Sequence, residues 1–230
     1  MSEQTDKAYR RAIVTGDYAG TANEPTDLAA NITRGPGYAA EYGRNIRGAV
    51  RALWSGVLDY DQFYNMMIAT VRFGLPRNWN AGAAECGIKP SELSPAEQNA
   101  LQEAIFSEIN RISDFANAIE AGSKANGGKQ GVQLARASLW SARALDIQNR
   151  AKLMACADKK LKWVRGPTSD SCRTCIAMDG KVKRGSYWTE HGPHPQDPPN
   201  ETIMCHGWNC LCNMEPTDEP LSRGPLPRWP

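Results

Sequence analysis

A cluster of cysteines near the C-terminal end constrains this chain most strongly. The chain has 230 residues and seven cysteines, and the cluster reads Cys172-Arg-Thr-Cys175, then Cys205-His-Gly-Trp-Asn-Cys210-Leu-Cys212. A Cys-x-x-Cys turn brings two thiolates to the spacing of a tetrahedral metal site, and the second group can supply the remaining ligands. The loop between the two groups is rich in proline and glycine and poor in apolar residues, so it cannot form its own core. The sequence therefore predicts a structural Zn²⁺ ion that organises this region.

The ligand set stays open at this point, because five cysteines and His206 compete for four positions. The expected ligands are Cys172, Cys175, Cys205 and Cys210. Cys212 can replace either Cys205 or Cys210. The two remaining cysteines, Cys86 and Cys156, lie far from the cluster in sequence and are expected to be small, buried, apolar side chains.

These cysteines could in principle serve other chemistries than zinc binding. Disulfides would require an oxidising medium, and a redox-active Cys-x-x-Cys would need a surrounding βαβ pattern that the sequence lacks. A catalytic zinc keeps an open position beside a general base, for which Glu190, His191, His194 and Glu201 are available. The chain has no deaminase signature, no His-Glu-x-x-His, no nucleophile elbow and no phosphate-binding glycine loop. We therefore expect no enzymatic activity.

Charge and hydropathy narrow the remaining possibilities. The formal net charge is +2, so no global basic field favours nucleic acid or an anionic membrane. No apolar run reaches the roughly 18 residues of a membrane span, and the segment 1–11 is polar, without the apolar core of a secretion signal. The expected compartment is therefore reducing, where cysteines serve as metal ligands or buried thiols more often than as disulfides.

Composition and periodicity divide the chain into four segments. Residues 1–36 are polar and are expected to form a flexible or partner-bound arm. Residues 37–160 carry helical periodicity, residues 161–215 form the zinc module, and residues 216–230 are a proline-rich tail, either disordered or an extended strap on a neighbour. The predicted fold class is mainly α: a helical domain, then a small irregular or β module stabilised by zinc, with extended arms at both ends.

Four helices are expected in the helical segment. The first carries apolar residues from Tyr42 to Val57 at steps of three and four. The second begins at an Asp59–Gln62 cap and stops at Gly74 and Pro76, so that 77–93 is a loop. The third begins at a Ser94–Glu97 capping box and continues to Gly122. The fourth covers about 132–160 and carries a heptad seam that includes Leu161.

Three arginines fall seven residues apart on one face of the fourth predicted helix: Arg136, Arg143 and Arg150. The simpler interpretation is that they are solvated and paired with neighbours such as Asp146. The functional interpretation is contact with a nucleic-acid backbone or with an acidic partner surface.

The C-terminal pattern resembles a known family. It comprises Trp163, the run from Thr168 through Cys172-Arg-Thr-Cys175 to Gly180-Lys-Val, then Trp188, a proline-rich stretch and a Cys-x-Cys. This pattern is similar to the C-terminal region of tailed-phage head morphogenesis proteins, the minor capsid group that includes the Mu F-like proteins. The helical stretch around Arg143 and the run 87–97 also look like that group, so the resemblance covers roughly residues 40 to 215. That family's second cluster commonly reads His-Pro-x-Cys-x-Cys, and its histidine has no exact counterpart here. The third ligand therefore stays open between Cys205 and His206.

The resemblance implies a non-enzymatic bacteriophage virion protein. Such proteins bind portal or major capsid subunits during head assembly, so we expect several copies in a virion and a location in the host cytoplasm before that. Contact with DNA stays open, and no membrane is expected. The alternative is a zinc-dependent nucleic-acid-binding or nuclease-like protein, based on the three arginines and on lysines near the cysteines such as Lys181 and Lys183.

Overall fold

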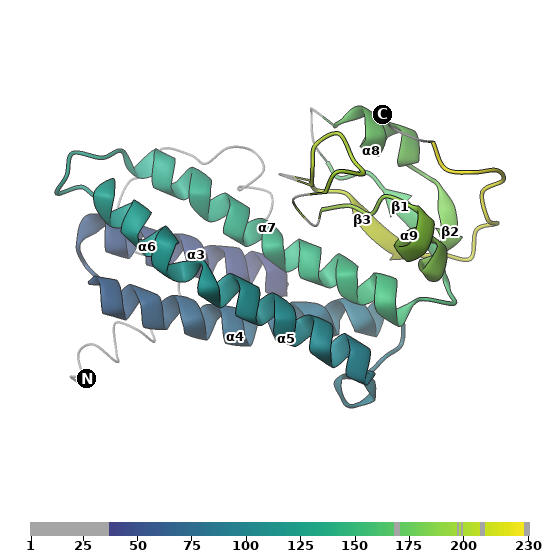
Figure 1. The fold of residues 1–230 in the computed structure, drawn as a ribbon, viewed down its shortest axis with the longest axis horizontal. Coiled ribbons are helices and arrows are strands. Elements are labelled where there is room, and N and C mark those ends of the chain that lie inside the picture. Colours follow the sequence, from purple (N-terminus) through teal and green to yellow (C-terminus); the bar gives the residue numbers. More distant parts are fainter. Residues whose placement is uncertain (1–36, 168–170, 197, 199, 208–209, 228–230) are drawn as a thin grey trace. The chain divides into compact units, whose positions relative to one another are not determined.

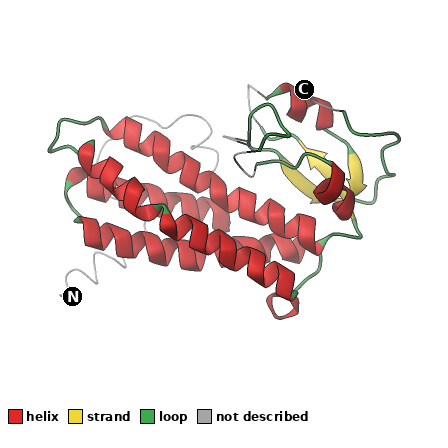
Figure 2. Cartoon of the chain, viewed as in Figure 1, coloured by secondary structure: helices red, strands yellow, loops and turns green. Residues whose placement is uncertain are grey.

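The structure is a computed structural model that describes residues 37–227 except 168–170, 197, 199 and 208–209. The predicted N-terminal arm, residues 1–36, lies outside the described residues. Long helices dominate the chain, and a small three-stranded sheet follows them (Figures 1 and 2). The prediction of a mainly α fold with a small β module near the C-terminus is therefore confirmed.

The elements follow one another as helices first and strands later. The N-terminal helices are α3 (Tyr38–Ser55), α4 (Tyr60–Glu85), a 3₁₀ turn η1 (Pro90–Glu92), α5 (Pro95–Asn110), α6 (Ile112–Ala121) and α7 (Gln130–Ala155). The C-terminal elements are β1 (Lys160–Val164), α8 (Arg173–Met178), β2 (Val182–Arg184), α9 (Gly185–His191) and β3 (Asn213–Pro216). None of the helices in the described part of the chain combines the length and apolarity that a membrane span requires.

The chain forms two compact units, and three of the long helices contribute residues to both. The first unit takes its described residues from 37–75 and 102–144, and the second comprises residues 76–101 and 145–230. The described residues of the first unit form helices joined by loops, without a strand. The second unit contains the ends of α4 and α7, the start of α5, the sheet and all five clustered cysteines.

Aromatic side chains hold the first unit together. Phe63 of α4 meets Phe115 of α6 edge-on with ring centroids 6.0 Å apart, and Phe115 stacks on Trp140 of α7 at 5.2 Å. Such pairs contribute about 1 kcal/mol each beyond the burial of their area. On α3, the predicted apolar face is buried from Tyr42 to Leu53, and Gly56 ends the helix in the left-handed conformation, leaving Val57 exposed.

The predicted helix starts are confirmed by their capping bonds. The Gln62 amide N–H donates to the Asp59 carboxylate at 2.8 Å, and the Asp59 N–H donates to the Gln62 side chain at 3.1 Å. The Ser94 N–H donates to the Glu97 carboxylate at 2.9 Å, and the Glu97 N–H donates back to the Ser94 hydroxyl at 3.3 Å. Each box satisfies backbone donors that a helix start leaves unpaired.

Two predicted helix ends were wrong, and the third predicted helix, which does end at Gly122, is interrupted. Helix α4 does not stop at Gly74 and Pro76 but continues to Glu85, so 77–93 is not simply a loop. The predicted third helix breaks at Arg111 into α5 and α6. Helix α7 ends at Ala155, and Leu161 is a buried residue of β1 instead of the last layer of a helical seam.

The sheet of the second unit is antiparallel, with strand order β2-β1-β3. Leu161 pairs with Lys183 of β2, and Trp163 pairs with Met214 of β3. Strand β1 alternates between half-buried and fully buried residues, so Leu161 and Trp163 point into the core. There Trp163 meets Trp188 of α9 with ring centroids 5.9 Å apart, and the Trp188 indole N–H donates to the Leu161 carbonyl at 3.1 Å.

The described part of the proline-rich tail lies on the chain's own sheet. The Thr217 N–H donates to the Lys160 carbonyl at 3.1 Å, and the Ser222 N–H donates to the Val182 carbonyl at 2.9 Å. The ammonium of Lys183 donates to the carbonyls of Ser222 at 2.8 Å and Gly224 at 2.6 Å. Leu226 is buried in the same core as the two tryptophans. The tail was predicted to be disordered or a strap on a neighbour; within residues 216–227 it is instead an extended strap on the sheet of its own chain.

Candidate metal centre

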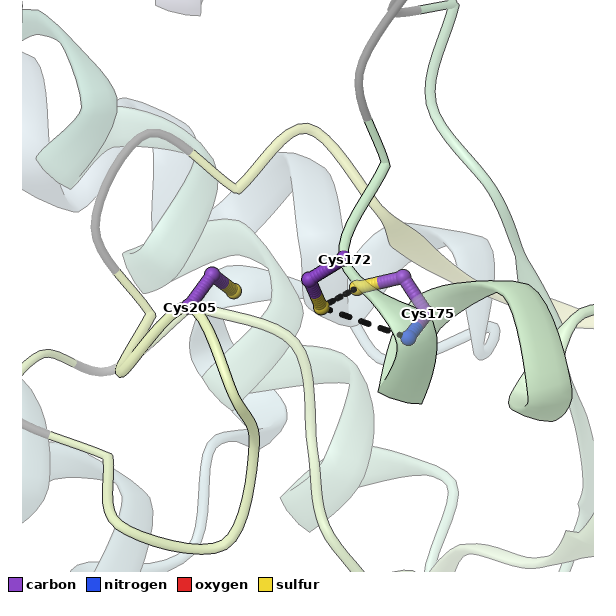
Figure 3. Close-up of side chains that lie close together, drawn as sticks. All are labelled: Cys172, Cys175 and Cys205. Atoms are coloured by element: carbon purple, nitrogen blue, oxygen red, sulfur yellow. Dashed lines mark hydrogen bonds between the residues drawn. The ribbon is translucent and has the colours of Figure 1, made fainter.

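Cys172 and Cys175 are positioned by the first turn of α8. Cys172 is the N-cap residue, and its sulfur accepts the Cys175 backbone N–H at 3.4 Å. The two sulfurs lie 3.3 Å apart (Figure 3). A short helix that starts inside the Cys-x-x-Cys motif thus turns both thiols toward the same point.

Cys205 reaches this pair from the loop that follows α9. Its sulfur points toward Cys172 and Cys175 in Figure 3. The Met204 N–H donates to the Thr174 hydroxyl at 3.0 Å, which ties the loop to α8. The loop turns back at His206 and Gly207, whose φ angles of 49° and 77° are both left-handed. A side chain at Gly207 would overlap the Gln196 carbonyl, so glycine is required there by both φ and space.

Two buried amide side chains position Cys210 and Cys212. Gln196 donates from its side chain to the Cys210 carbonyl at 3.0 Å and to the Cys212 carbonyl at 3.3 Å. Asn149 of α7 donates to Gln196 at 2.9 Å and accepts the Met214 N–H at 3.0 Å. Sequence reasoning missed both residues, since a single Asn or Gln carries no spacing signal that distinguishes it from a surface residue.

The five sulfurs form two overlapping triads. One contains Cys172, Cys175 and Cys205, the other contains Cys175, Cys210 and Cys212, and within each triad the sulfurs lie within 4.8 Å of one another. Cys175 belongs to both. Cys175, Cys210 and Cys212 are buried, and the other two cysteines are half-buried. All five predicted cysteines therefore converge, although they come from segments about thirty residues apart.

The sulfur spacings fit metal coordination better than disulfide bonding. Four thiolates about 2.3 Å from a tetrahedral Zn²⁺ are about 3.8 Å apart. The Cys175 and Cys210 sulfurs are 3.9 Å apart, and all five cysteines are free. A disulfide would require roughly 2.05 Å. The centre can therefore hold a metal ion.

Hydrogen bonds among the thiols shift their pKa values in opposite directions. The thiol of Cys175, followed by that of Cys210, donates to Cys205 and lowers its pKa far below the ordinary value, and the Gly207 N–H acts in the same direction. The same two thiols lower the pKa of Cys212, helped by the Gly166 N–H and the Trp163 indole. The pKa of Cys175 is raised, first by its bond to Cys205, because it is the donor. The pKa of Cys210 is raised as well, so without a metal ion the thiols hydrogen-bond one another, and a bound ion, which requires deprotonated sulfur, would replace those bonds.

The Trp163 indole supports the same interpretation. This side chain is fully buried, and its N–H has no hydrogen-bond partner of regular geometry within the described part of the chain. It nevertheless interacts with the Cys212 sulfur closely enough to lower the thiol's pKa. A buried indole N–H normally finds an acceptor, and a metal-bound thiolate would serve as one.

The candidate histidines and carboxylates do not join the cluster. Among the described residues, His206 is absent from both triads, and its side chain is exposed. Geometry therefore favours Cys205 over His206 as the third ligand. His191 lies on an exposed surface beside Glu190, at 3.7 Å. No described His, Asp or Glu forms a candidate metal group with the five cysteines.

The three arginines on α7 differ from one another in their surroundings. Arg136 is exposed and Arg150 is half-buried. The Arg143 side chain is only 15% exposed and lies 3.3 Å from the Glu108 carboxylate, which Arg111 also contacts at 2.9 Å. Lys183, named for the nucleic-acid alternative, is buried and bonded to the tail. Arg143 and Lys183 are thus engaged inside the protein.

The expectation for Cys86 and Cys156 was incomplete. Both are buried, as predicted, but they are joined by a disulfide. Cys86 follows α4 and Cys156 follows α7, and the sequence separation of 70 residues hid their proximity. The wrongly placed ends of the two helices concealed it further.

The chain was also compared with known proteins. It matches no family model, no curated protein and no solved structure.

Proposed function

We propose that the five-cysteine centre binds one structural Zn²⁺ ion. The observation that carries this proposal is the convergence of thiol groups from two distant segments within the second unit. An all-sulfur ligand set favours zinc or another soft ion over magnesium or calcium. Burial of three of the sulfurs, and the lack of a described histidine or carboxylate in the cluster, favour a closed structural site over a catalytic one.

Zinc would supply cohesion that side chains alone do not give this region. Among the described residues of the segment 192–212 there is neither helix nor strand, and Ile203 is the one buried isoleucine, leucine or valine. A structural Zn²⁺ can contribute on the order of 10 kcal/mol to folding. The ion would join α8 to this loop and to the start of β3, and so fix the edge of the sheet.

Chelation tests the zinc proposal. Treatment with a strong chelator should remove one ion per chain and expose the thiols to a chromogenic thiol reagent. Loss of near-UV signal from Trp163 and Trp188 should accompany it, because both rings lie in the core beside the cysteines. An untreated protein that has no bound metal but gives a native near-UV spectrum would reject the proposal.

For the whole protein we propose a non-enzymatic role in assembly of a bacteriophage head, as a minor virion protein bound to portal or capsid subunits. The support is the resemblance of the cysteine pattern and its flanking tryptophans to tailed-phage head morphogenesis proteins. A closed all-cysteine site leaves no open metal position for a substrate, which is consistent with a role without catalysis.

Fractionation of phage particles tests this role. The protein should copurify with virions or proheads in several copies and should be released from them with portal or capsid subunits. Its absence from both particles would reject the role. If it instead bound DNA with an affinity that falls steeply as salt rises, the nucleic-acid alternative would replace it.

A further inference from the structure

The end of the strap, residues 222–227, attaches to the sheet as an extended peptide ligand would; we call it the anchoring segment. The Trp163 N–H of β1 donates to the Lys181 carbonyl at 2.9 Å, so the backbone of the next residue, Val182, faces away from β1. Ser222 satisfies both groups there. Its N–H donates to the Val182 carbonyl at 2.9 Å, and its hydroxyl accepts the Val182 N–H at 3.0 Å. Bonds of this kind at a sheet edge also hold peptides that come from another chain.

The Lys183 side chain holds the backbone of the same segment. Its ammonium donates to the Ser222 carbonyl at 2.8 Å and to the Gly224 carbonyl at 2.6 Å. Lys183 is itself well positioned, because it is only 9% exposed and its Nζ lies 4.9 Å from the centre of the Tyr187 ring. A buried ammonium requires acceptors, so removal of the segment would deprive this cation of two partners. The sheet thus carries a built site for two carbonyls of an extended chain.

An apolar side chain completes the attachment. Leu226 is buried, and a Cβ added to Gly192 would lie 3.0 Å from the Leu226 Cδ1 and 2.9 Å from the Trp188 ring. The leucine therefore occupies space beside the tryptophan that a glycine leaves open. We call the surface formed by Val182, Lys183, Trp188 and Gly192 the acceptor site.

The connection that leads to the anchoring segment is exposed at each of its residues, 218–221. The Glu219 carboxylate lies 2.6 Å from the Lys162 ammonium, but these two side chains are 51% and 31% exposed. The Lys160 ammonium donates to two carbonyls of the connection. Exposed ion pairs contribute little to stability, so the connection can change its path at small cost while the anchoring segment keeps its contacts.

We propose that the acceptor site of one copy of this chain also takes the anchoring segment of a second copy, so that chains are joined by exchanged straps. The inference depends neither on the zinc ion nor on a role in phage assembly. The contacts in the acceptor site are the same in both cases, and only the path of the connection differs. The chain's own segment competes at an effective concentration of about 1 mM, which is typical of a short flexible connection. Exchange therefore increases as copies become more concentrated.

Cysteine trapping in the full chain tests the exchange. Val182 and Ser222 are joined by two hydrogen bonds, so V182C and S222C place two thiols side by side. Under mild oxidation, the double variant V182C/S222C is the control and should close a bridge within one chain. An equal mixture of the two single variants should give a linked dimer whose yield rises as the protein approaches about 1 mM. Peptide mass spectrometry should place the bridge between positions 182 and 222.

A labelled peptide of residues 216–227 gives a second measurement that needs no added cysteine. It should bind the L226A chain more tightly than the wild type, because the strap of that variant has lost its apolar side chain. The same peptide with Leu226→Ala should not bind.

The inference is overturned if the control closes but the mixture gives no bridge between positions 182 and 222 at about 1 mM. It is equally overturned if the peptide does not bind L226A, and this measurement decides alone if the control does not close. A chain without metal, or one absent from phage particles, would reject the proposed function and leave the exchange standing.

Discussion

At the scale of single residues, the cysteine centre depends on glycines that allow the backbone to turn and to approach closely. Gly207 has a φ of 77°, and its position leaves no room for a side chain beside the Gln196 carbonyl. Its N–H also acts on the Cys205 sulfur. One residue therefore shapes the loop, allows Gln196 to reach the Cys-x-Cys carbonyls and supports a ligand.

We predict that G207A weakens metal binding and destabilises the second unit. The left-handed conformation costs an alanine about 1 kcal/mol, and the overlap with Gln196 adds to this cost. The matched control is G224A, because Gly224 has a φ of 72° but nothing within 4 Å of the added methyl group. Thermal unfolding of the zinc-loaded variants should show a clearly larger loss for G207A. Equal losses would mean that the close approach to Gln196 does not matter.

Glu108 offers a second test at this scale, in the first unit. Burial raises the pKa of this carboxyl above its ordinary value of 4.5, although Arg143 and Arg111 act in the opposite direction. The native state therefore keeps the proton to a higher pH than the unfolded chain does. The stability linked to Glu108 is present below pH 4.5 and is lost as pH rises through the raised native pKa.

We accordingly predict that E108Q flattens the fall in unfolding free energy as pH rises above 4.5. Urea unfolding at a series of pH values measures this slope. E120Q on the exposed surface of α6 is the control and should leave the slope unchanged. A steeper fall in E108Q than in the wild type would contradict the sign of the shift.

At the scale of elements, the tail shows how an extended segment without helix or central strand becomes ordered. Its backbone N–H groups donate hydrogen bonds to the carbonyls of Lys160 and Val182, and the Lys183 ammonium donates to two carbonyls of the tail. The Lys183 Nζ also lies 4.9 Å above the Tyr187 ring. Leu226 then places an apolar side chain in the core of the second unit.

We predict that L226A destabilises the second unit by about 2 kcal/mol, a typical lower value for removing a buried leucine side chain. L221A is the control, because Leu221 is 44% exposed and should cost far less. Proteolysis of the tail, followed by mass spectrometry, would reveal detachment in L226A. The same cleavage pattern in both variants would show that Leu226 does not anchor the strap.

Local signals in the sequence predicted elements better than boundaries. The Ser94–Glu97 and Asp59–Gln62 boxes were readable because capping is decided within four residues. Pro76 wrongly predicted the end of the second helix. Helix α4 continues past it, and Leu75, Trp79 and Ala83 form one buried face on both sides of the proline. A proline costs a helix about 3 kcal/mol, and burial of such a face offsets that cost. Only tertiary packing reveals this.

The metal centre shows the same division between local and long-range information. The five cysteines were identified from spacing, since a Cys-x-x-Cys pair and a second cluster are local patterns. The supporting Asn149 and Gln196 were not identified, because their roles arise from contacts across 47 residues. The Cys86–Cys156 pairing was missed for the same reason.

At the scale of the whole molecule, the disulfide closes a loop that includes α5, α6 and α7. In the chain-entropy view, a loop of this length can contribute about 4 kcal/mol by restricting the unfolded state. The sequence predicted a reducing compartment, in which disulfides are rare. Whether this disulfide stabilises the protein can be tested by comparing its stability with and without a reductant.

We predict that C86A/C156A lowers the unfolding free energy by about 2–4 kcal/mol without loss of metal. Both sulfurs lie outside the two triads, so the ion should stay bound. Urea unfolding with and without a thiol reductant measures the effect, and the variant itself should be insensitive to the reductant. A wild-type curve that the reductant does not change would show that the disulfide contributes no stability.

The central claim is that thiolates from Cys172–Cys175 and from Cys205–Cys212 share one ion. Native mass spectrometry of the wild-type chain, before and after denaturation, tests it most directly. The account predicts a native mass that exceeds the denatured mass by one zinc ion, with five alkylatable thiols after denaturation and the Cys86–Cys156 disulfide intact. A compact native chain that carries no metal would contradict it.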